Sequence, residues 1–138
     1  MKTFGLMLIV LAACVPFSIA QTFEDGSRRT LGYISAGGTV EDSSKRTIGY
    51  IDSDGSVEDS SRRTLGYLKK DGTVEDSSRR TLGYIKSDGT VENASRSTLG
   101  YVESDGSVED SSRRTIGYAK GVKIQHAAVF FFFFFKPK

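Results

Sequence analysis

The stretch that decides the fold is RTIGYIDSDGSVEDSS, residues 46–61, because most of the chain between residues 23 and 118 repeats it. A glycine followed by a tyrosine recurs every 17 residues, with the glycines at positions 32, 49, 66, 83, 100 and 117. Repeats at a fixed spacing indicate that one supersecondary unit is used several times in succession. The period therefore decides the fold class before any other signal.

Each unit predicts a β-hairpin. Residues 47–51 (TIGYI) are rich in β-branched and aromatic side chains, and residues 56–59 (SVED) predict a short return strand. Asp54-Gly55 between them is a turn signal, because glycine adopts positive φ without cost. Gly49 leaves room inside the first strand for the close approach of backbone or of a ring. The turn glycines of the five copies are Gly38, Gly55, Gly72, Gly89 and Gly106.

Two turn types fit this hairpin, and they put different residues opposite one another. A two-residue turn pairs Asp52 with Val57 and places Val57 on the face of Ile48 and Tyr50, whereas a three-residue turn with a bulge pairs Ile51 with Val57. We favour the two-residue turn. In both registers the first strand carries apolar side chains on both faces, so each hairpin needs neighbours to bury them.

The two ends of the repeat region are complementary half-units. Residues 23–25 match the return strand of a hairpin, and residues 115–118 begin a first strand that never reaches its turn. An open solenoid usually ends in altered polar repeats, but here the end copies resemble the middle ones. We therefore expect a closed ring, and the period alone leaves five or six units open. The five full hairpins lie at 30–42, 47–59, 64–76, 81–93 and 98–110.

Residues 1–20 predict a signal peptide with an apolar segment and a small-residue cleavage site at residues 18–20. Cleavage there exports residues 21–138 as a single domain, secreted or periplasmic. An alternative is a lipoprotein box at residues 11–14 (LAAC), which would anchor the protein through a lipid on Cys14.

Composition excludes several classes of function for the mature chain. Removal of the signal peptide takes one of 19 basic residues and leaves 18 against 17 acidic ones, a net charge of +1. That balance argues against a nucleic-acid groove. The only cysteine is removed as well, so neither a disulfide nor a cysteine metal site is expected.

No constellation for catalysis or metal binding stands out. His126 is the sole histidine and has no nucleophile motif around it, which favours a structural role. Residues 52–55 (DSDG) resemble the start of a calcium loop, but the ligand series does not continue, so a turn is favoured. We expect no enzyme, no metal and no cofactor.

The repeated polar and aromatic side chains have two interpretations each. An acidic pair and a basic pair in each unit, such as residues 58–59 and 62–63, predict a solvated rim of opposite charges. The tyrosines either form a wall of the core, which we favour, or stack on sugars. The candidate ligand-contacting residues are Tyr33, Tyr50, Tyr67, Tyr84, Tyr101 and Tyr118.

The apolar tail is too short to cross a bilayer as a helix. Within the expected strand at residues 124–135, six successive phenylalanines present rings to both faces, so we expect the ring to cover it as a core strand. The alternative is a tail that contacts a membrane or partner, which Lys136 and Lys138 would suit. The six are Phe130, Phe131, Phe132, Phe133, Phe134 and Phe135.

The tandem GY(I/L)xxDG(S/T)VEDSSRRT units, with GYAKGVK at 117–123 and the AAVFFF ending, resemble the five-fold β-flower proteins of exported bacterial origin. The resemblance covers essentially all of residues 21–138. It implies an all-β, pseudo-symmetric ring of five hairpins, and it implies no established activity.

The symmetric repeats without a catalytic constellation favour a non-enzymatic, exported structural or interaction module of the bacterial envelope. The alternative is a multivalent carbohydrate-binding module that uses the repeated tyrosines. A glycan or an envelope protein would be the partner, and no nucleic acid is expected.

Overall fold

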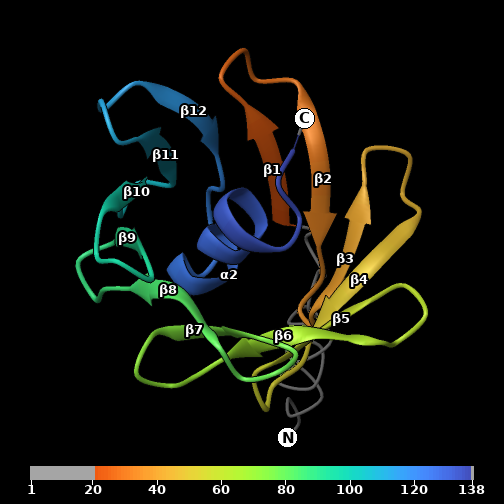
Figure 1. Cartoon of the computed structure of the whole chain (residues 1–138). Coiled ribbons are helices and arrows are strands. Elements are labelled where there is room, and N and C mark those ends of the chain that lie inside the picture. The colour runs from red at the N-terminus through yellow and green to blue at the C-terminus, as the bar shows by residue number, and fades with distance from the viewer. Residues whose placement is uncertain (1–20, 138) are drawn as a thin grey trace, which may run out of the picture.

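In the computed structural model, which describes residues 21–137, the repeats pair side by side into a closed antiparallel barrel (Figure 1). The predicted signal peptide, with Cys14, lies outside the described residues. The strands are β1 (Gln21–Asp25), β2 (Thr30–Ile34), β3 (Thr39–Asp42), β4 (Thr47–Ile51), β5 (Ser56–Asp59), β6 (Thr64–Leu68), β7 (Thr73–Asp76), β8 (Thr81–Ile85), β9 (Thr90–Asn93), β10 (Thr98–Val102), β11 (Ser107–Asp110) and β12 (Thr115–Tyr118).

The two half-units close the ring. β1 pairs with β12, with Glu24 opposite Tyr118 and Asp25 opposite Gly117. Five continuous hairpins, from β2–β3 to β10–β11, occupy the rest of the circle, so the paired ends fill a sixth position. The prediction of an all-β closed ring is confirmed, and the five expected hairpins are accompanied by this sixth pair of strands.

The favoured hairpin register was wrong. Ile51 lies opposite Val57 and Tyr50 opposite Glu58, so the turn is the three-residue type with a bulge. The Asp52 N–H donates to the carbonyl of Ser56 at 2.8 Å, and the turn glycine has φ +96°. This register is the better one because it turns Ile51 and Val57 together into the interior, where both are buried.

A second turn of the same form joins each hairpin to the next. The Asp59 N–H donates to the Arg63 carbonyl at 2.9 Å, and Arg62 has φ +70°. The register then shifts at a β-bulge, because Val57 lies opposite Gly66 while Glu58 lies opposite Thr64. A bulge can re-aim the extra residue toward the core. The half-buried residues at this position, which pack against the core, are Leu31, Ile48, Leu65, Leu82, Leu99 and Ile116.

The tail lies inside the ring, but the predicted strand at 124–135 was wrong. Residues 124–128 form α2 (Ile124–Ala128), which continues as the π-helix η1 (Val129–Phe133). Every strand of a closed ring is already paired on both sides, so a central strand would leave its backbone N–H and C=O groups without partners. A helix forms most of its backbone hydrogen bonds within itself, and so it can occupy the middle of the ring (Figure 1).

Successive phenylalanines of the tail lie on the glycines of successive units. A Cβ atom added at Gly117 would lie 2.6 Å from the ring of Phe131, and the ring of Phe132 meets Gly100 in the same way. The series continues in reverse repeat order with Phe133 on Gly83, Phe134 on Gly66 and Phe135 on Gly49. Each ring thus occupies the space that a side chain at the glycine would need.

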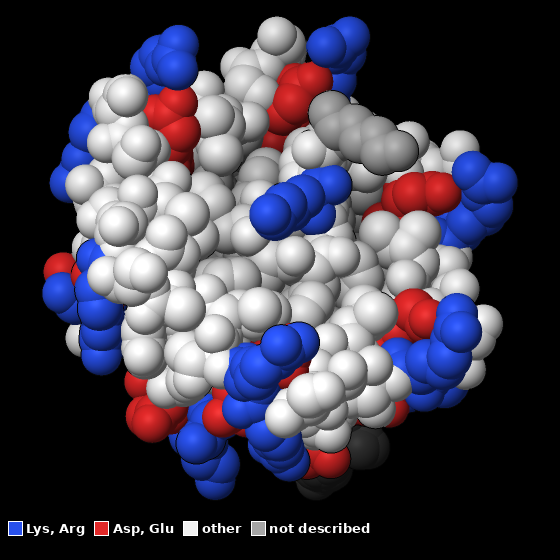
Figure 2. Space-filling model, in the orientation of Figure 1, with Lys and Arg blue, Asp and Glu red and all other residues white. Residues whose placement is uncertain are grey.

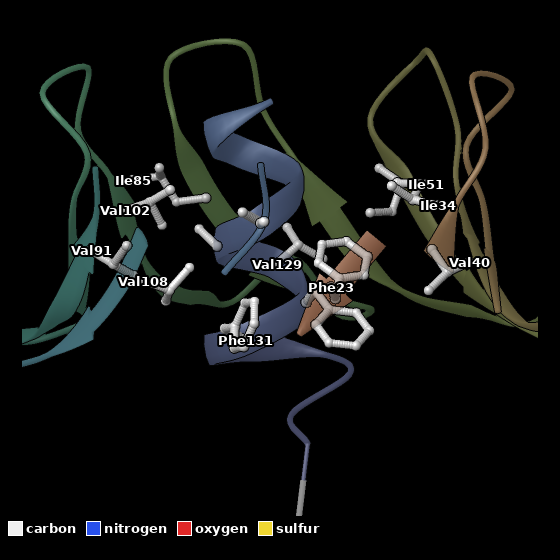
Figure 3. Close-up of a cluster of buried hydrophobic side chains, with 14 of the residues drawn as sticks. Phe23, Ile34, Val40, Ile51, Ile85, Val91, Val102, Val108, Val129 and Phe131 are labelled. Atoms are coloured by element: carbon white, nitrogen blue, oxygen red, sulfur yellow. The ribbon is translucent and has the colours of Figure 1, made fainter. Parts of the chain in front are cut away.

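The remaining sector of the ring is filled by a pair of stacked rings. Phe130 stacks on Phe23 with centroids 3.9 Å apart and planes inclined by 6°. Phe23 takes the place that valine holds in the other units and pairs with Gly32. Figure 3 shows Phe23 beside the central helix and the surrounding ring of isoleucine and valine side chains that face it.

The π-helical turn helps to match the tail to the ring. Neighbouring positions in a six-position ring are separated by about 60°, whereas an α-helix turns by about 100° per residue. A π-helix, marked by the i→i+5 bond from the Phe134 N–H to the Val129 carbonyl at 3.0 Å, turns by less per residue. The angular steps between successive phenylalanines therefore come closer to the steps between units.

Candidate functional site

The repeated tyrosines lie on the outer face of the ring, each within a small polar cluster. Tyr50 of β4 lies opposite Glu58 of β5. The guanidinium of Arg62 covers the Tyr50 ring at 3.6 Å from its centroid, and its Nη1 atom donates to Oε1 of Glu58 at 2.9 Å. The tyrosine ring, the cation and the carboxylate thus form one triad on the outside of this hairpin.

A cation lies over the tyrosine ring at all six positions, with cation–centroid distances of 3.5–3.7 Å, and at five of them it also pairs with a glutamate. Lys45, which lies over Tyr33, forms no ion pair among residues 21–137. At the closing position the cation comes from the start of the chain and the tyrosine from its end, so the joint between β1 and β12 reproduces the cluster. The six pairs are Arg28 on Tyr118, Lys45 on Tyr33, Arg62 on Tyr50, Arg79 on Tyr67, Arg96 on Tyr84 and Arg113 on Tyr101.

The left-handed backbone of the second turn positions the cation. Arg62 has φ +70°, a conformation that costs a non-glycine residue about 1–3 kcal/mol. Cation–π contact contributes about 0.5–1 kcal/mol at exposed sites, and an exposed ion pair about 0.2–1 kcal/mol. The two contacts are therefore of a size to offset much of the strain. The hydrogen bond to Glu58 also raises the pKa of the Arg62 guanidinium.

This arrangement differs from both sequence-based interpretations of the tyrosines. They do not form a wall of the core, because the inward positions of β4 belong to Gly49 and Ile51. They are not exposed rings on which a sugar could stack from either side, because a cation lies over one face of each ring. The signal was present in the sequence, since a basic residue follows the tyrosine by 12 positions in every continuous unit.

The aspartate that precedes the second turn stabilises its backbone. Oδ1 of Asp59 accepts hydrogen bonds from the N–H groups of Ser61 at 2.8 Å and Arg63 at 3.0 Å. The bond from Arg63, together with that from Ser61 and the charge of Arg63, holds the pKa of this carboxyl below its usual value. In β9, Asn93 makes the same two bonds. Figure 2 shows acidic and basic groups gathered in clusters around the rim, with mostly uncharged atoms at the centre of the face.

His126 lies half-buried in α2, on the central helix. Burial, and then the charge of Lys123, lower the pKa of its imidazole. Asp52, the first residue of the calcium-like sequence, instead has a raised pKa because burial disfavours its charged form. Across residues 21–137, no group of three or more histidine, cysteine, aspartate and glutamate side chains is arranged to hold a metal ion.

The six tail phenylalanines belong to the interior packing rather than to a separate extension. Phe130 and Phe131 are buried, and residues 132–135 are half-buried where the helix reaches the end of the ring. In the part of the chain that the structure describes, no helix combines the length and the apolar character needed to cross a bilayer.

Comparison with known proteins identifies the family. Residues 20–135 match the family model described as 5-fold beta-flower protein, and the chain belongs to this family. The match spans nearly all of the described ring and its central helix, so the resemblance seen in the repeats is confirmed. No curated protein and no solved structure matched the chain.

Proposed function

We propose that this β-flower protein is a non-enzymatic, exported structural or interaction module of the bacterial envelope. The observation that carries the proposal is the outer surface, where a cation covers each of the six tyrosine rings and, at five positions, also pairs with a carboxylate. Groups that are paired in this way give a solvated, stable surface and supply no activated nucleophile or base. The ring is thus suited to presenting a rigid shape.

Export is the part of the proposal that the first 20 residues support. Expression of the full chain in a bacterium, followed by cell fractionation and intact-mass analysis, should give protein that begins at Gln21 in the periplasm or the medium. A diacylated chain that begins at Cys14 would place the module on a membrane instead and would contradict a freely soluble protein.

The absence of catalysis is tested through the sole histidine. Purified residues 21–138 should turn over none of a panel of ester, phosphoester and glycoside substrates. Turnover that disappears in a folded His126→Gln variant would overturn the proposal, because His126 is the residue with the most suitable pKa for general acid–base chemistry.

Carbohydrate binding by the tyrosines is the alternative function, and the cation that covers each tyrosine ring argues against it. A sugar stacks on an exposed aromatic face, but Arg62 or its equivalent lies over each ring. We expect no saturable signal from the wild-type chain on a glycan array. Binding that is lost in folded Tyr50→Ala and Tyr84→Ala variants would replace our proposal with the lectin function.

A further inference from the structure

The central helix leaves a cavity on one side of the ring. α2 packs against β10, and the strands opposite β10 in the ring are β4 and β5. A cavity of about 590 Å³ lies on that opposite side, between α2 and the turns of the first three hairpins. This volume is within the range of about 300–1,000 Å³ that is typical of small-molecule sites.

The cavity contains a lysine that breaks the repeat. Lys70 is on its wall, and the equivalent positions of the other hairpins hold small residues: Ala36, Ser53, Ser87 and Ser104. Lys123, which precedes α2, also lines the cavity from the helix side. Two lysines therefore line the same cavity, one from a turn and one from the segment that precedes α2.

These two lysines differ from the other cations of the wall. Lys69 and Arg79 both pair with Glu75, at 3.8 Å and 3.1 Å. Between residues 21 and 137, neither Lys70 nor Lys123 forms an ion pair. Their charges are thus available to an anion in the cavity.

The rest of the lining leaves the cavity positive. Its cations are Lys69, Lys70, Arg79 and Lys123, and its carboxylates are Asp52 and Asp54, which gives 4 − 2 = +2. Asp52 is itself opposed by Arg62 at 3.5 Å, and Asp54 accepts a hydrogen bond from the Ser56 N–H at 2.9 Å. Neither carboxylate therefore acts as a dedicated partner for Lys70 or Lys123.

Apolar and neutral polar groups complete the lining. Ile51 and Leu68 supply apolar surface, and His126 faces the cavity from α2. Burial, and then the charge of Lys123, lower the pKa of His126 and so favour its neutral imidazole, which has one donor and one acceptor nitrogen. An apolar lining with a few convergent polar groups is the usual composition of a small-ligand site.

We propose that this cavity binds a small organic anion, with its carboxylate or phosphate group between Lys70 and Lys123 and its body against Ile51 and Leu68. Tyr67 and Arg79 of one outer triad border the cavity, but Arg79 is already paired with Glu75, so the anion is assigned to the two lysines. The inference does not depend on the envelope function. The ligand is a free solute rather than the headgroup of a lipid in a membrane.

The test is titration calorimetry of residues 21–138 with citrate and with glycerol 3-phosphate, and with glycerol as the neutral control. Both anions should bind saturably, and glycerol should not. Lys70→Ser should weaken binding about tenfold or more, which is the size expected for the loss of one charged hydrogen-bond donor. This variant restores the serine found in three other hairpins, so it should fold.

Lys86→Ser is the matched control, because it removes the same charge from a turn outside the cavity. Its affinity for citrate should equal that of the wild type. NMR signals of the His126 imidazole should shift during the citrate titration, which locates the bound anion. Binding of neither anion, equal weakening in both lysine variants, or binding only to phosphatidylglycerol vesicles would each overturn the proposal.

Discussion

Each unit contains two turns with the same backbone form, but the residue that adopts the left-handed conformation is a glycine in one turn and a non-glycine residue in the other. In the turn at residues 52–56 the left-handed position is Gly55, with φ +96°. In the turn at residues 59–63 it is Arg62, with φ +70°. Non-glycine residues rarely adopt this region, so the second turn requires an explanation that the first does not.

The surroundings of the two turns provide that explanation. The Gly55 carbonyl accepts a hydrogen bond from the Leu68 N–H at 2.7 Å, and a Cβ atom at Gly55 would overlap the Leu68 carbonyl oxygen. That turn is therefore locked against the next hairpin, and only glycine fits. The Arg62 turn faces solvent, so its side chain has room to reach Tyr50 and Glu58. Strain is avoided where the chain is crowded and is offset by contacts where it is not.

The largest expected effect tests whether the locked turns alone hold the ring closed. We expect a chain that ends at Val129 to lose cooperative unfolding and to aggregate, because five rings that fill the space over glycines would be missing, as would Phe130 on Phe23. Circular dichroism melting and size-exclusion chromatography measure this. A chain that ends at Lys136 is the control and should behave as the full chain. An unchanged melting temperature for the shorter chain would show that the strands and turns suffice.

Gly55→Val should cost at least about 1–3 kcal/mol in the free energy of unfolding, because it adds both left-handed strain and overlap with the Leu68 carbonyl. Ser53→Val in the same turn is the control. Ser53 is exposed and has no positive φ, so we expect a change within about 0.5 kcal/mol. Urea denaturation of both variants gives the comparison, and equal midpoints would contradict the role assigned to the glycine.

At the turn that contains Arg62, we expect a substitution by glycine to destabilise the protein less than a substitution by alanine. Arg62→Ala keeps the left-handed strain and loses the contacts to Tyr50 and Glu58, so we expect a loss of about 1–2 kcal/mol. Arg62→Gly loses the same contacts but relieves the strain, so it should cost less than Arg62→Ala. Arg63→Ala, which removes only an exposed pair with Asp59, is the control and should change stability by under about 0.5 kcal/mol. If glycine cost more than alanine, the strain would not be what the contacts offset.

The smallest effect concerns pH. Asp59 has a folded-state pKa below its ordinary value of 3.8, so its contribution to stability is present above that value and is lost as the pH falls through the folded pKa. Asp59→Asn should keep the two backbone hydrogen bonds and make the acid-induced fall in melting temperature shallower below about pH 4. Asn93→Asp is the converse variant and should make the fall steeper. Identical acid profiles for the three chains would show that these carboxyls are not perturbed by their turns.

Much of the ring could be predicted because the 17-residue period carries redundant information. The hairpins, the glycine turn and the complementary ends all follow from patterns that recur in each copy. The register was missed because Asp-Gly suits both turn types. Ile51 and Val57 could have decided it, since only the register that pairs them turns these two side chains inward together.

The central helix and the triads depend on contacts that no local pattern shows. Six phenylalanines in a row fit a strand as well as a helix, and the choice depends on the closed ring having no free strand edge. The left-handed arginine was missed because its sequence, Ser-Ser-Arg-Arg, has no glycine to mark the turn. Its position is stabilised by Tyr50, which is 12 residues earlier in the chain.

The matching of Phe131–Phe135 to five glycines also limits how the tandem repeat can change over generations. Nearly identical 17-residue segments favour unequal recombination, which adds or removes whole copies. A chain that gained one unit would contain a second glycine, besides Gly32, with no phenylalanine on it, and a chain that lost one would contain a phenylalanine with no glycine to pack on. The length of the tail therefore records the number of units, and any gain or loss of a repeat would have to be accompanied by a change in the tail.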